Sequence, residues 1–252
     1  MTSLLLALQF LTVIPIKVKN FTETKLITSM VFFPVIGFFI ASLLILVNNL
    51  LLYLGFSNFI INIILVVALV LITAGMHLDG LSDTFDAIAS SKPKEAMLAI
   101  MRDSHSGVMG VLSIICVLLL KISFLCSIDS IYKTGALILM CVLGRWSLVF
   151  LLFMFPYARK VGKAKIFSEG INLKILITAT AFSLSCAVIF FGIDGLSIMV
   201  LAMLFAFLFG KFMVKKIEGI TGDSLGACCE LIEVAVLFLI AILAKAGLFY
   251  GK

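Results

Sequence analysis

The sequence predicts an all-α membrane protein, a polytopic bundle of about seven transmembrane helices (six to eight) with an N-terminal interfacial or re-entrant helix. Hydrophobic residues make up 63% of the 252-residue chain, charged residues only 13%, and the mean hydropathy is +1.29. A soluble domain cannot bury this much apolar surface. The apolar runs have the roughly 20 residues of a spanning helix, not the ~10-residue alternation of barrel strands. We therefore expect one integral-membrane domain that covers residues 1–252.

The expected elements follow from the apolar runs in chain order. Residues 2–16 form a short run that ends at Pro15, which favours an interfacial or re-entrant helix and leaves open whether this run crosses the membrane. Asp194 and Gly195 favour a tight turn between two later runs, which predicts a helical hairpin there. The candidate spans are 30–54, 59–76, 108–127, 134–155, 173–192, 196–213 and 231–250.

The basic residues predict how the bundle is oriented. Lysines and arginines gather in one set of alternating connections, whereas the opposite set carries only Lys133 and the C-terminal Lys252. The positive-inside rule makes the basic set cytoplasmic. The net charge of +6 is therefore a membrane-topology signal, and we expect no nucleic-acid partner. The basic set comprises Lys17, Lys19, Lys25, Lys92, Lys94, Arg102, Arg159, Lys160, Lys163, Lys165, Lys174, Lys211, Lys215 and Lys216.

The cysteine pattern excludes two kinds of site. The six cysteines are scattered, mostly inside apolar runs, and none forms a CxxC or Cys/His spacing. Such cysteines pack as small apolar residues. We therefore expect neither a disulfide framework nor a zinc site.

The first polar block follows an apolar run and contains three aspartates. Asp79, Asp83 and Asp86 have the spacing i, i+4, i+7, which places them on one face of a helix. Carboxylates this close repel one another, so a bound cation would stabilise them, and oxygen ligands favour Mg²⁺ or Mn²⁺. Gly80 would let a phosphate or a second helix approach closely. The alternative is a solvated acidic helix end that only terminates a span.

The second polar block is the segment 102–107. Asp103 would be a further ligand or would orient Arg102 onto a phosphate. His105 would be a general base, although a solvated loop histidine is an equally good interpretation. Ser104 and Ser106 are also typical of helix capping before the next span.

The third polar block is the segment 219–230. Asp223 and Glu230 share a helix face, and Glu233 flanks it. Glutamates that enter an apolar span are costly unless they are used, so we expect this block to complete the acidic site or to supply the base. Gly222 suits close approach of the backbone to a bulky anionic ligand.

Three further cations need partners. Arg145 lies in the middle of a span, so it would contact a phosphate, pair with the aspartate cluster or serve a structural pairing. Lys121 lies nearer to a span end, where it could snorkel to the interface. Arg159 belongs to a basic loop that would capture a phosphorylated substrate, or that reflects only the topology signal.

All the acid-rich blocks fall on the expected cytoplasmic side, although they are far apart in the sequence. An enzyme that acts on cytoplasmic substrates needs only one face, whereas a transporter needs polar groups near mid-membrane that both sides can reach. Metal-binding carboxylates, arginines and a basic rim together indicate phosphoryl or phosphodiester transfer. The residues alone do not identify the substrate.

Five blocks carry a resemblance to a known family: LQFLTVIP at 8–15, HLDGLSDTFDA at 77–87, MRDSHSGVMG at 101–110, FPYAR at 155–159 and GITGDSLGA at 219–227. They resemble the cobalamin synthase (adenosylcobinamide-GDP ribazoletransferase) family nearly from end to end. The resemblance implies that α-ribazole, or its 5′-phosphate, attacks the cobinamide-linked phosphate of adenosylcobinamide-GDP. GMP would leave, and adenosylcobalamin or its 5′-phosphate would form.

The resemblance also implies a setting and a set of site residues. The family uses Mg²⁺ and sits in the cytoplasmic (inner) membrane of prokaryotes, and a homo-oligomer or an association with other corrinoid-pathway enzymes stays open. The expected metal ligands are Asp79, Asp83 and Asp86. The expected catalytic residues are Asp83, Asp103, His105 and Glu230, and the expected substrate-binding residues are Gly80, Arg102, Arg145, Arg159, Gly222 and Asp223.

Two other functions are alternatives. The CDP-alcohol phosphotransferases share an Asp-Gly pair like Asp79-Gly80, but the rest of their motif spacing does not fit this chain. An ion-coupled transporter is the other alternative, and the one-sided placement of the acids argues against it.

Overall fold

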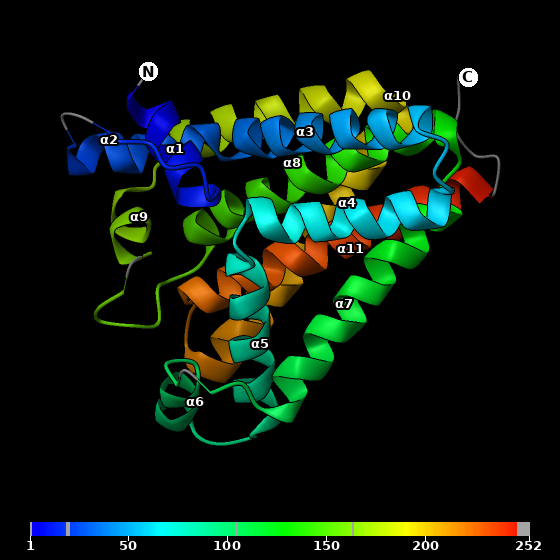
Figure 1. Ribbon diagram of the computed structural model, residues 1–252. Helices are drawn as coiled ribbons and strands as arrows, with labels where there is room; N and C mark the ends of the chain where they lie inside the picture. Colours follow the sequence, from blue (N-terminus) through cyan, green and yellow to red (C-terminus); the bar gives the residue numbers. More distant parts are fainter. Residues whose placement is uncertain (1, 19–20, 104, 163, 246–252) are drawn as a thin grey trace.

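The computed structural model describes residues 2–18, 21–103, 105–162 and 164–245, and these form an all-α bundle (Figure 1). The described residues contain no strands, so the predicted fold class is confirmed. The helices are α1 (Thr2–Leu11), α2 (Glu23–Thr28), α3 (Phe33–Tyr53), α4 (Asn58–Ile72), α5 (Met76–Ala89), α6 (Lys94–Ile100), α7 (Val108–Ser127), α8 (Ser130–Met154), α9 (Lys165–Gly170), α10 (Leu173–Ile217) and α11 (Gly222–Lys245), with a 3-10 turn at Ser29–Phe32.

Five helices in the described part of the chain are long and apolar enough to cross a membrane. They are the run Glu23–Tyr53 and the helices α7, α8, α10 and α11. A sixth candidate is the pair α4 and α5, which meet at a bend of 88°. As expected, α1 is short, with ten residues. The sequence predicted about seven spans partly because the two halves of α10 were counted as two separate spans.

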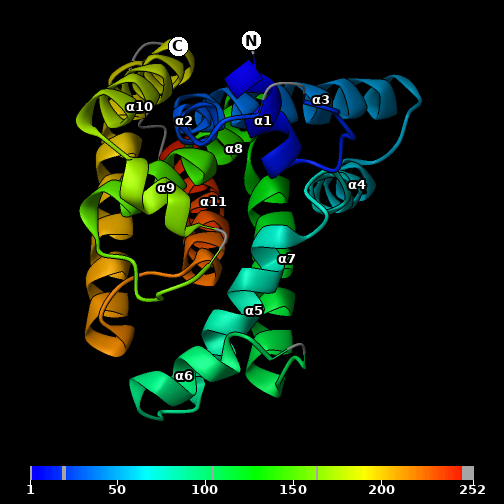
Figure 2. The same ribbon diagram turned by 90° about the vertical axis from the view of Figure 1, so that its left-hand side faces the viewer.

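The predicted break between these two spans is present, but it lies at Gly192 and not at the predicted turn of Asp194 and Gly195, which are helical. The φ of 58° and ψ of −132° at Gly192 suit glycine alone. The two halves of α10 then run in different directions (Figure 2). Gly195 packs against the backbone of Ala187, where a Cβ would clash.

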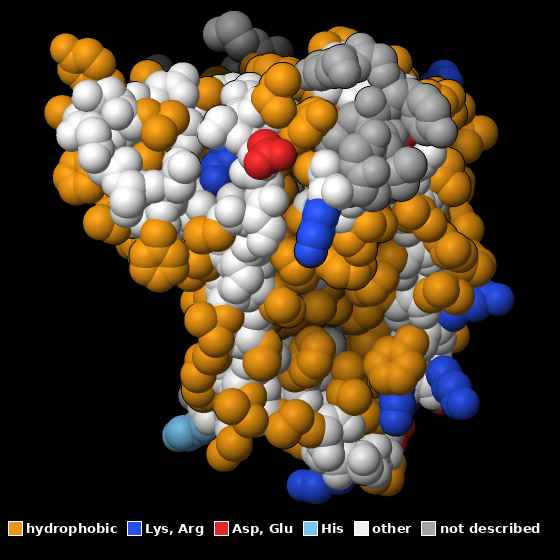
Figure 3. All heavy atoms as spheres, turned by 90° about the vertical axis from the view of Figure 1, so that its right-hand side faces the viewer, with side chains coloured by type: hydrophobic (Ala, Val, Ile, Leu, Met, Phe, Trp, Pro, Cys, Tyr) orange, Lys and Arg blue, Asp and Glu red, His pale blue; other side chains and the backbone are white. Residues whose placement is uncertain are grey.

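Helix α8 is the centre of the bundle. Every residue from Gly135 to Leu152 is buried, because α3, α10 and α11 all pack against this helix. The surrounding helices carry apolar side chains outward, and Figure 3 shows a face on which charged side chains are few and a hollow is lined by apolar ones. An apolar outer surface around a buried central helix is typical of a bundle in lipid.

Four buried charged side chains join three of the spanning helices, and we call them the buried ion network. Lys121 of α7 pairs with Glu230 of α11 at 2.6 Å and also with Glu233. Arg145 of α8 pairs with Glu233 from the other side. All four side chains are at most 6% exposed. The network contains two positive and two negative groups, so its charges balance.

The buried ion network decides three expectations. Lys121 does not snorkel to the interface, because it is buried between two glutamates. Of the alternatives for Arg145, the structural pairing is the one present: its partner is Glu233, and Arg145 lies outside the lining of the cavity described below. Glu230 likewise lies outside the cavity lining. These four charged side chains lie inside the spans because they pair with one another. Mutual pairing makes charge tolerable inside a membrane span even where it serves no ligand or substrate.

Helices α5 and α11 approach each other closely at two glycines. A methyl group at Gly80 would lie 2.6 Å from the carbonyl oxygen of Asp223, and one at Gly226 would lie 3.2 Å from the Cα of His77. Both distances are shorter than ordinary van der Waals contact. Gly80 therefore admits a second helix, as one of the two sequence interpretations expected. The contact brings the aspartates of α5 beside Asp223.

A short backbone pairing fixes the loop after α8 against the connection before α11. Tyr157 and Ile220 form an isolated parallel bridge. The N–H of Ala158 donates to the carbonyl of Ile220 at 2.8 Å, and the N–H of Ile220 donates to that of Pro156 at 2.9 Å. Gly219 allows this approach, since a Cβ there would lie 2.5 Å from the oxygen of Pro156. The pairing delivers Arg159 to the start of α11.

Glu233→Gln should destabilise the bundle strongly, because two buried cations would then face one glutamate. Removing one partner of a buried ion pair costs about 3–5 kcal/mol. Thermal unfolding in detergent can be followed by the fluorescence of Trp146, which is the single tryptophan of the chain and is buried in α8.

Two comparisons test the cause of this loss. Glu218→Gln breaks the exposed Lys94–Glu218 pair of 2.5 Å and should change stability by at most about 1 kcal/mol. Lys121→Met combined with Glu230→Gln keeps the charges balanced and should be more stable than Lys121→Met alone. Equal stability of these two proteins would contradict the charge-balance account.

Gly80→Ala should push α5 away from α11, because the added methyl group meets backbone that cannot move aside. Overpacking of this kind costs about 1–3 kcal/mol. Gly222→Ala is the matched control for thermal stability, since its methyl group would have its nearest neighbour at 3.8 Å. A Gly80→Ala protein as stable as the Gly222→Ala protein would show that the two helices can separate at no cost.

Candidate active site

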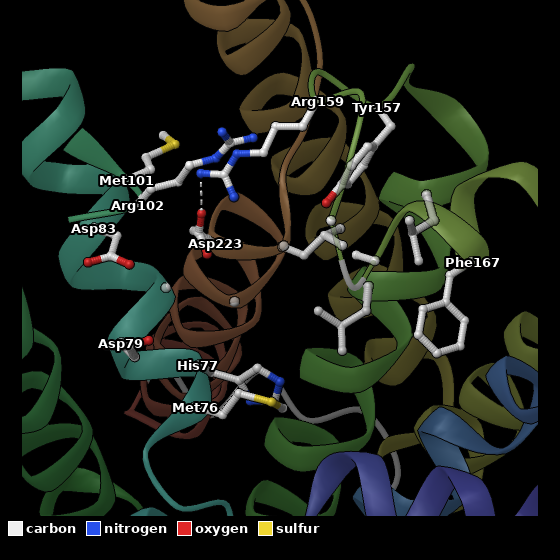
Figure 4. Close-up of a pocket in the computed structure, with 18 of the residues that line it drawn as sticks. Met76, His77, Asp79, Asp83, Met101, Arg102, Tyr157, Arg159, Phe167 and Asp223 are labelled. Atoms are coloured by element: carbon white, nitrogen blue, oxygen red, sulfur yellow. Dashed lines mark ion pairs between the residues drawn. The ribbon is translucent and has the colours of Figure 1, made fainter. Parts of the chain in front are cut away.

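A cavity of about 680 Å³ opens where α5, the start of α11 and the two loops after α6 and α8 meet (Figure 4). Its volume lies in the range of ligand sites. Charged and polar side chains line one end, and apolar ones line the other. The lining residues are Phe10, Phe33, Met76, His77, Asp79, Gly80, Asp83, Met101, Arg102, Asp103, Ser106, Leu148, Leu152, Tyr157, Arg159, Gly162, Ala164, Phe167, Gly222, Asp223, Leu225 and Gly226.

The bend between α4 and α5 directs the first aspartates toward the cavity. Ala74 and Gly75 adopt positive φ angles of 52° and 63°, which ends α4 and allows α5 to begin at once in a new direction. Asp79 and Asp83, one helical turn apart on α5, both line the cavity. Neither side chain makes a hydrogen bond or an ion pair with the described residues, so their oxygens are available to a ligand.

Asp86 is placed differently from the sequence expectation. Its two carboxylate oxygens accept hydrogen bonds from the N–H groups of Gly107 at 2.6 Å and Gly110 at 2.8 Å. These are free donors at the start of α7, which a carboxylate satisfies well. Asp86 therefore lies outside the cavity lining and caps α7, which was the role expected of Ser104 or Ser106. Ser104 lies outside the described residues.

Two arginines reach the cavity from different loops, Arg102 from the end of α6 and Arg159 from the loop after α8. Figure 4 shows both side chains extending toward Asp223. The Nη2 of Arg159 lies 2.7 Å from Oδ2 of Asp223, which makes an ion pair. The buried Nε of Arg159 has no hydrogen-bond acceptor among the described residues. A buried guanidinium donor of this kind suits an anionic ligand.

Asp103 and His105 pair with each other at the rim of the cavity. The Nδ1 of His105 lies 2.7 Å from Oδ1 of Asp103, and its backbone N–H donates to the same oxygen at 3.1 Å. These hydrogen bonds from His105 hold the pKa of Asp103 below its ordinary value. Asp103 lines the cavity, but the side chain of His105 is 90% exposed and lies outside the lining. The side chain of His105, the expected base, therefore does not line the cavity together with Asp79 and Asp83.

Two polar lining residues had no role in the sequence interpretation. Tyr157 is half-buried, and burial is the main cause that raises the pKa of its hydroxyl, so the group stays neutral at pH 7. His77 is buried, with its Nδ1 3.6 Å from the sulfur of Cys229. Both residues lie inside sequence blocks that were singled out, and only the folded chain shows that they point to a cavity.

The lining residues include a set that could hold a divalent cation together with a phosphate. No group of three or more His, Cys, Asp or Glu side chains in the described ranges is arranged as a complete metal site. Asp79 and Asp83 offer carboxylates that pair with no other described residue, and Asp223 lies beside α5 at the start of α11. Mg²⁺ is commonly held by one or two carboxylates plus substrate phosphates, and this donor set fits that arrangement.

Comparisons with known proteins agree with this geometry. A family model described as cobalamin-5-phosphate synthase matches residues 3–241. The chain is 35% identical to the adenosylcobinamide-GDP ribazoletransferase of Desulforamulus reducens over 95% of this chain and 96% of that one. It is 38% identical to the enzyme of the same name from Clostridioides difficile, over 96% and 98%. No solved structure matches the chain significantly.

The family match covers all the residues that line the cavity and every spanning helix except the last few residues of α11. The similarity to the curated relatives extends over nearly the whole of both chains. The chain therefore belongs to the cobalamin-5-phosphate synthase family, a family of membrane transferases of cobalamin biosynthesis.

Proposed function

We propose that this chain joins adenosylcobinamide-GDP to α-ribazole or to α-ribazole 5′-phosphate, giving adenosylcobalamin or its 5′-phosphate and GMP. The name shared by the curated relatives supports this reaction. The observation that carries the proposal at the level of residues is the polar end of the cavity, where Arg102 and Arg159 face the free carboxylates of Asp79 and Asp83.

The charges of this polar end match a pyrophosphate. Arg159 is only partly neutralised, because Asp223 occupies one edge of its guanidinium and leaves its buried Nε without an acceptor among the described residues. Arg102 brings a second positive charge from another loop. Guanidinium groups bind phosphate oxygens in pairs of parallel hydrogen bonds, which fixes the phosphorus for attack. These arginines would also stabilise the charge that develops in the transition state.

The chemical step is a displacement at the phosphorus that carries the cobinamide. A hydroxyl oxygen of the ribazole forms a new P–O bond, and the bond from that phosphorus to the bridging oxygen of the pyrophosphate breaks. The bridging oxygen leaves with the electron pair as part of GMP. We assign Asp83 to receive the proton of the attacking hydroxyl, because its free carboxylate lines the cavity.

Asp79 and Asp83 would hold Mg²⁺, with Mn²⁺ as a substitute, together with the substrate phosphates. The ion would neutralise charge on the leaving phosphate. Asp223 would orient Arg159 toward the same phosphates.

We also propose that the cavity opens to the cytoplasm. Two of the basic connections reach it, one through Arg102 and the other through Arg159. Basic residues at a cytoplasmic opening would attract anionic substrates from the cytoplasm. The same residues would satisfy the positive-inside rule.

The reaction can be tested by mass spectrometry on detergent-purified protein with adenosylcobinamide-GDP and α-ribazole 5′-phosphate. Mg²⁺ should allow release of GMP together with the coupled corrinoid, and EDTA should abolish both. Folded protein that makes neither product would refute the proposed reaction, and CDP-alcohols would then be the next donors to test.

Asp83 and Asp86, two aspartates of the α5 cluster, should respond differently to substitution. Asp83→Asn should lower turnover by roughly 10²-fold or more with little change in stability, since its carboxylate serves the reaction. Asp86→Asn should lower stability by about 1 kcal/mol, because one of its two bonds to the start of α7 is lost, and should keep most of the turnover.

Turnover and thermal unfolding of both variants, measured side by side, check this distinction. The control variant is Asp129→Asn. Asp129 is exposed, directly precedes α8 and does not line the cavity. Full turnover in the Asp83→Asn protein would remove Asp83 from the mechanism.

A further inference from the structure

The cavity has an apolar end whose role the phosphate chemistry does not explain. Six side chains form it: Phe10, Phe33, Phe167, Leu148, Leu152 and Leu225. They come from α1, α3, α9, α8 and α11, so five elements converge to build one wall. A wall assembled from this many elements near charged groups is typical of a ligand site with an apolar part.

Three aromatic rings give this end a defined shape. The rings of Phe10 and Phe33 stack with centroids 5.7 Å apart and planes 10° apart. Phe167 meets Phe10 at 5.1 Å and Phe33 at 5.8 Å, in both cases edge to face. Phe33 and Phe167 are 1% and 2% exposed, whereas Phe10 is half-buried. Two buried rings therefore hold a third ring that reaches the cavity.

We propose that this apolar end binds the aromatic base of the ribazole acceptor, an inference that rests on the proposed function. The base is a benzimidazole, which is flat, has two fused rings and carries few polar atoms. Stacking or edge contact with Phe10 would bury it beside Leu148 and Leu152. The ribose and any 5′-phosphate would then extend toward the arginines.

The same chemistry excludes the other base in the reaction. The guanine of the donor has a row of hydrogen-bond donors and acceptors along its edge, and the phenylalanines and leucines of this end offer none. Burying such groups without partners is costly, so guanine should not compete for this end. The two substrates would therefore occupy different ends of the cavity and meet at the aspartates.

This inference gives α1 a function. The helix is too short to span the membrane, yet its sequence block at 8–15 is one of the five that carry the family resemblance. The N–H of Val13 donates to the carbonyl of Ile72 at 2.8 Å, which ties the end of the block to α4 just before the bend into α5. Phe10 is thereby fixed relative to the catalytic aspartates.

The variant Phe10→Ala tests the inference, since the half-buried ring can be removed with little disturbance of the core. We expect the KM for α-ribazole to rise about tenfold, the loss typical of one base–aromatic contact. The KM for adenosylcobinamide-GDP should stay within about twofold. Phe182→Ala is the control, because Phe182 packs against Phe38 outside the cavity and should change neither KM.

A binding measurement separates this inference from the proposed reaction. Equilibrium dialysis of α-ribazole against the protein in EDTA needs no turnover, and Phe10→Ala should weaken this binding about tenfold. Phe10→Leu should weaken it less. Wild-type protein that binds α-ribazole but releases no GMP would refute the proposed reaction and leave the binding site standing.

The inference would be overturned by wild-type protein that does not bind α-ribazole, or by Phe10→Ala protein that binds it as tightly as wild type. A rise in the KM of the donor alone would also overturn it, since the apolar end would then hold the donor. If Phe10→Ala does not fold, Phe10→Leu keeps the core filled and should give a smaller rise in the acceptor KM with an unchanged donor KM. An unchanged acceptor KM in that variant would refute the proposal.

Discussion

The close contact between α5 and α11 is the constraint on which the rest of the site depends. Gly80 and Gly226 remove the side chains that would hold the two helices apart. The aspartates of α5 therefore lie beside Asp223, although more than a hundred residues separate them in the chain. The bridge between Tyr157 and Ile220 then adds Arg159 to the same place. Backbone packing, more than any ion pair, assembles the polar end of the cavity.

Charges inside this protein serve two separate purposes. Lys121, Arg145, Glu230 and Glu233 neutralise one another and hold α7, α8 and α11 together away from the cavity. The cavity, by contrast, contains the carboxylates of Asp79 and Asp83, which pair with no other residue in the part of the chain that the structure describes, and the guanidinium of Arg159, whose buried Nε has no acceptor there. Buried charges that are fully paired are typical of structure, and charges left unpaired at a cavity are typical of ligand binding.

The cavity combines these charged groups with an apolar wall, and this combination suits the proposed reaction of two nucleotide-like substrates. A pyrophosphate needs cations and metal ligands, whereas an aromatic base with few polar atoms needs rings and aliphatic side chains. Two of the six side chains of the apolar wall, Phe10 and Phe167, come from α1 and α9. These helices are too short to cross the bilayer, and both reach the cavity.

The sequence by itself determined the fold class, the positions of most apolar helices and the three polar blocks, because hydropathy and i, i+4 spacing are local properties. It also carried the family resemblance. Only the tertiary structure decided which acids share the cavity. Asp86 has the same spacing as Asp79 and Asp83, yet it caps α7. Glu230 shares a helix with Asp223, yet Lys121 neutralises it. The apolar wall was likewise hidden, because residues distant in the chain decide which side chains line a cavity and whether a charge is neutralised.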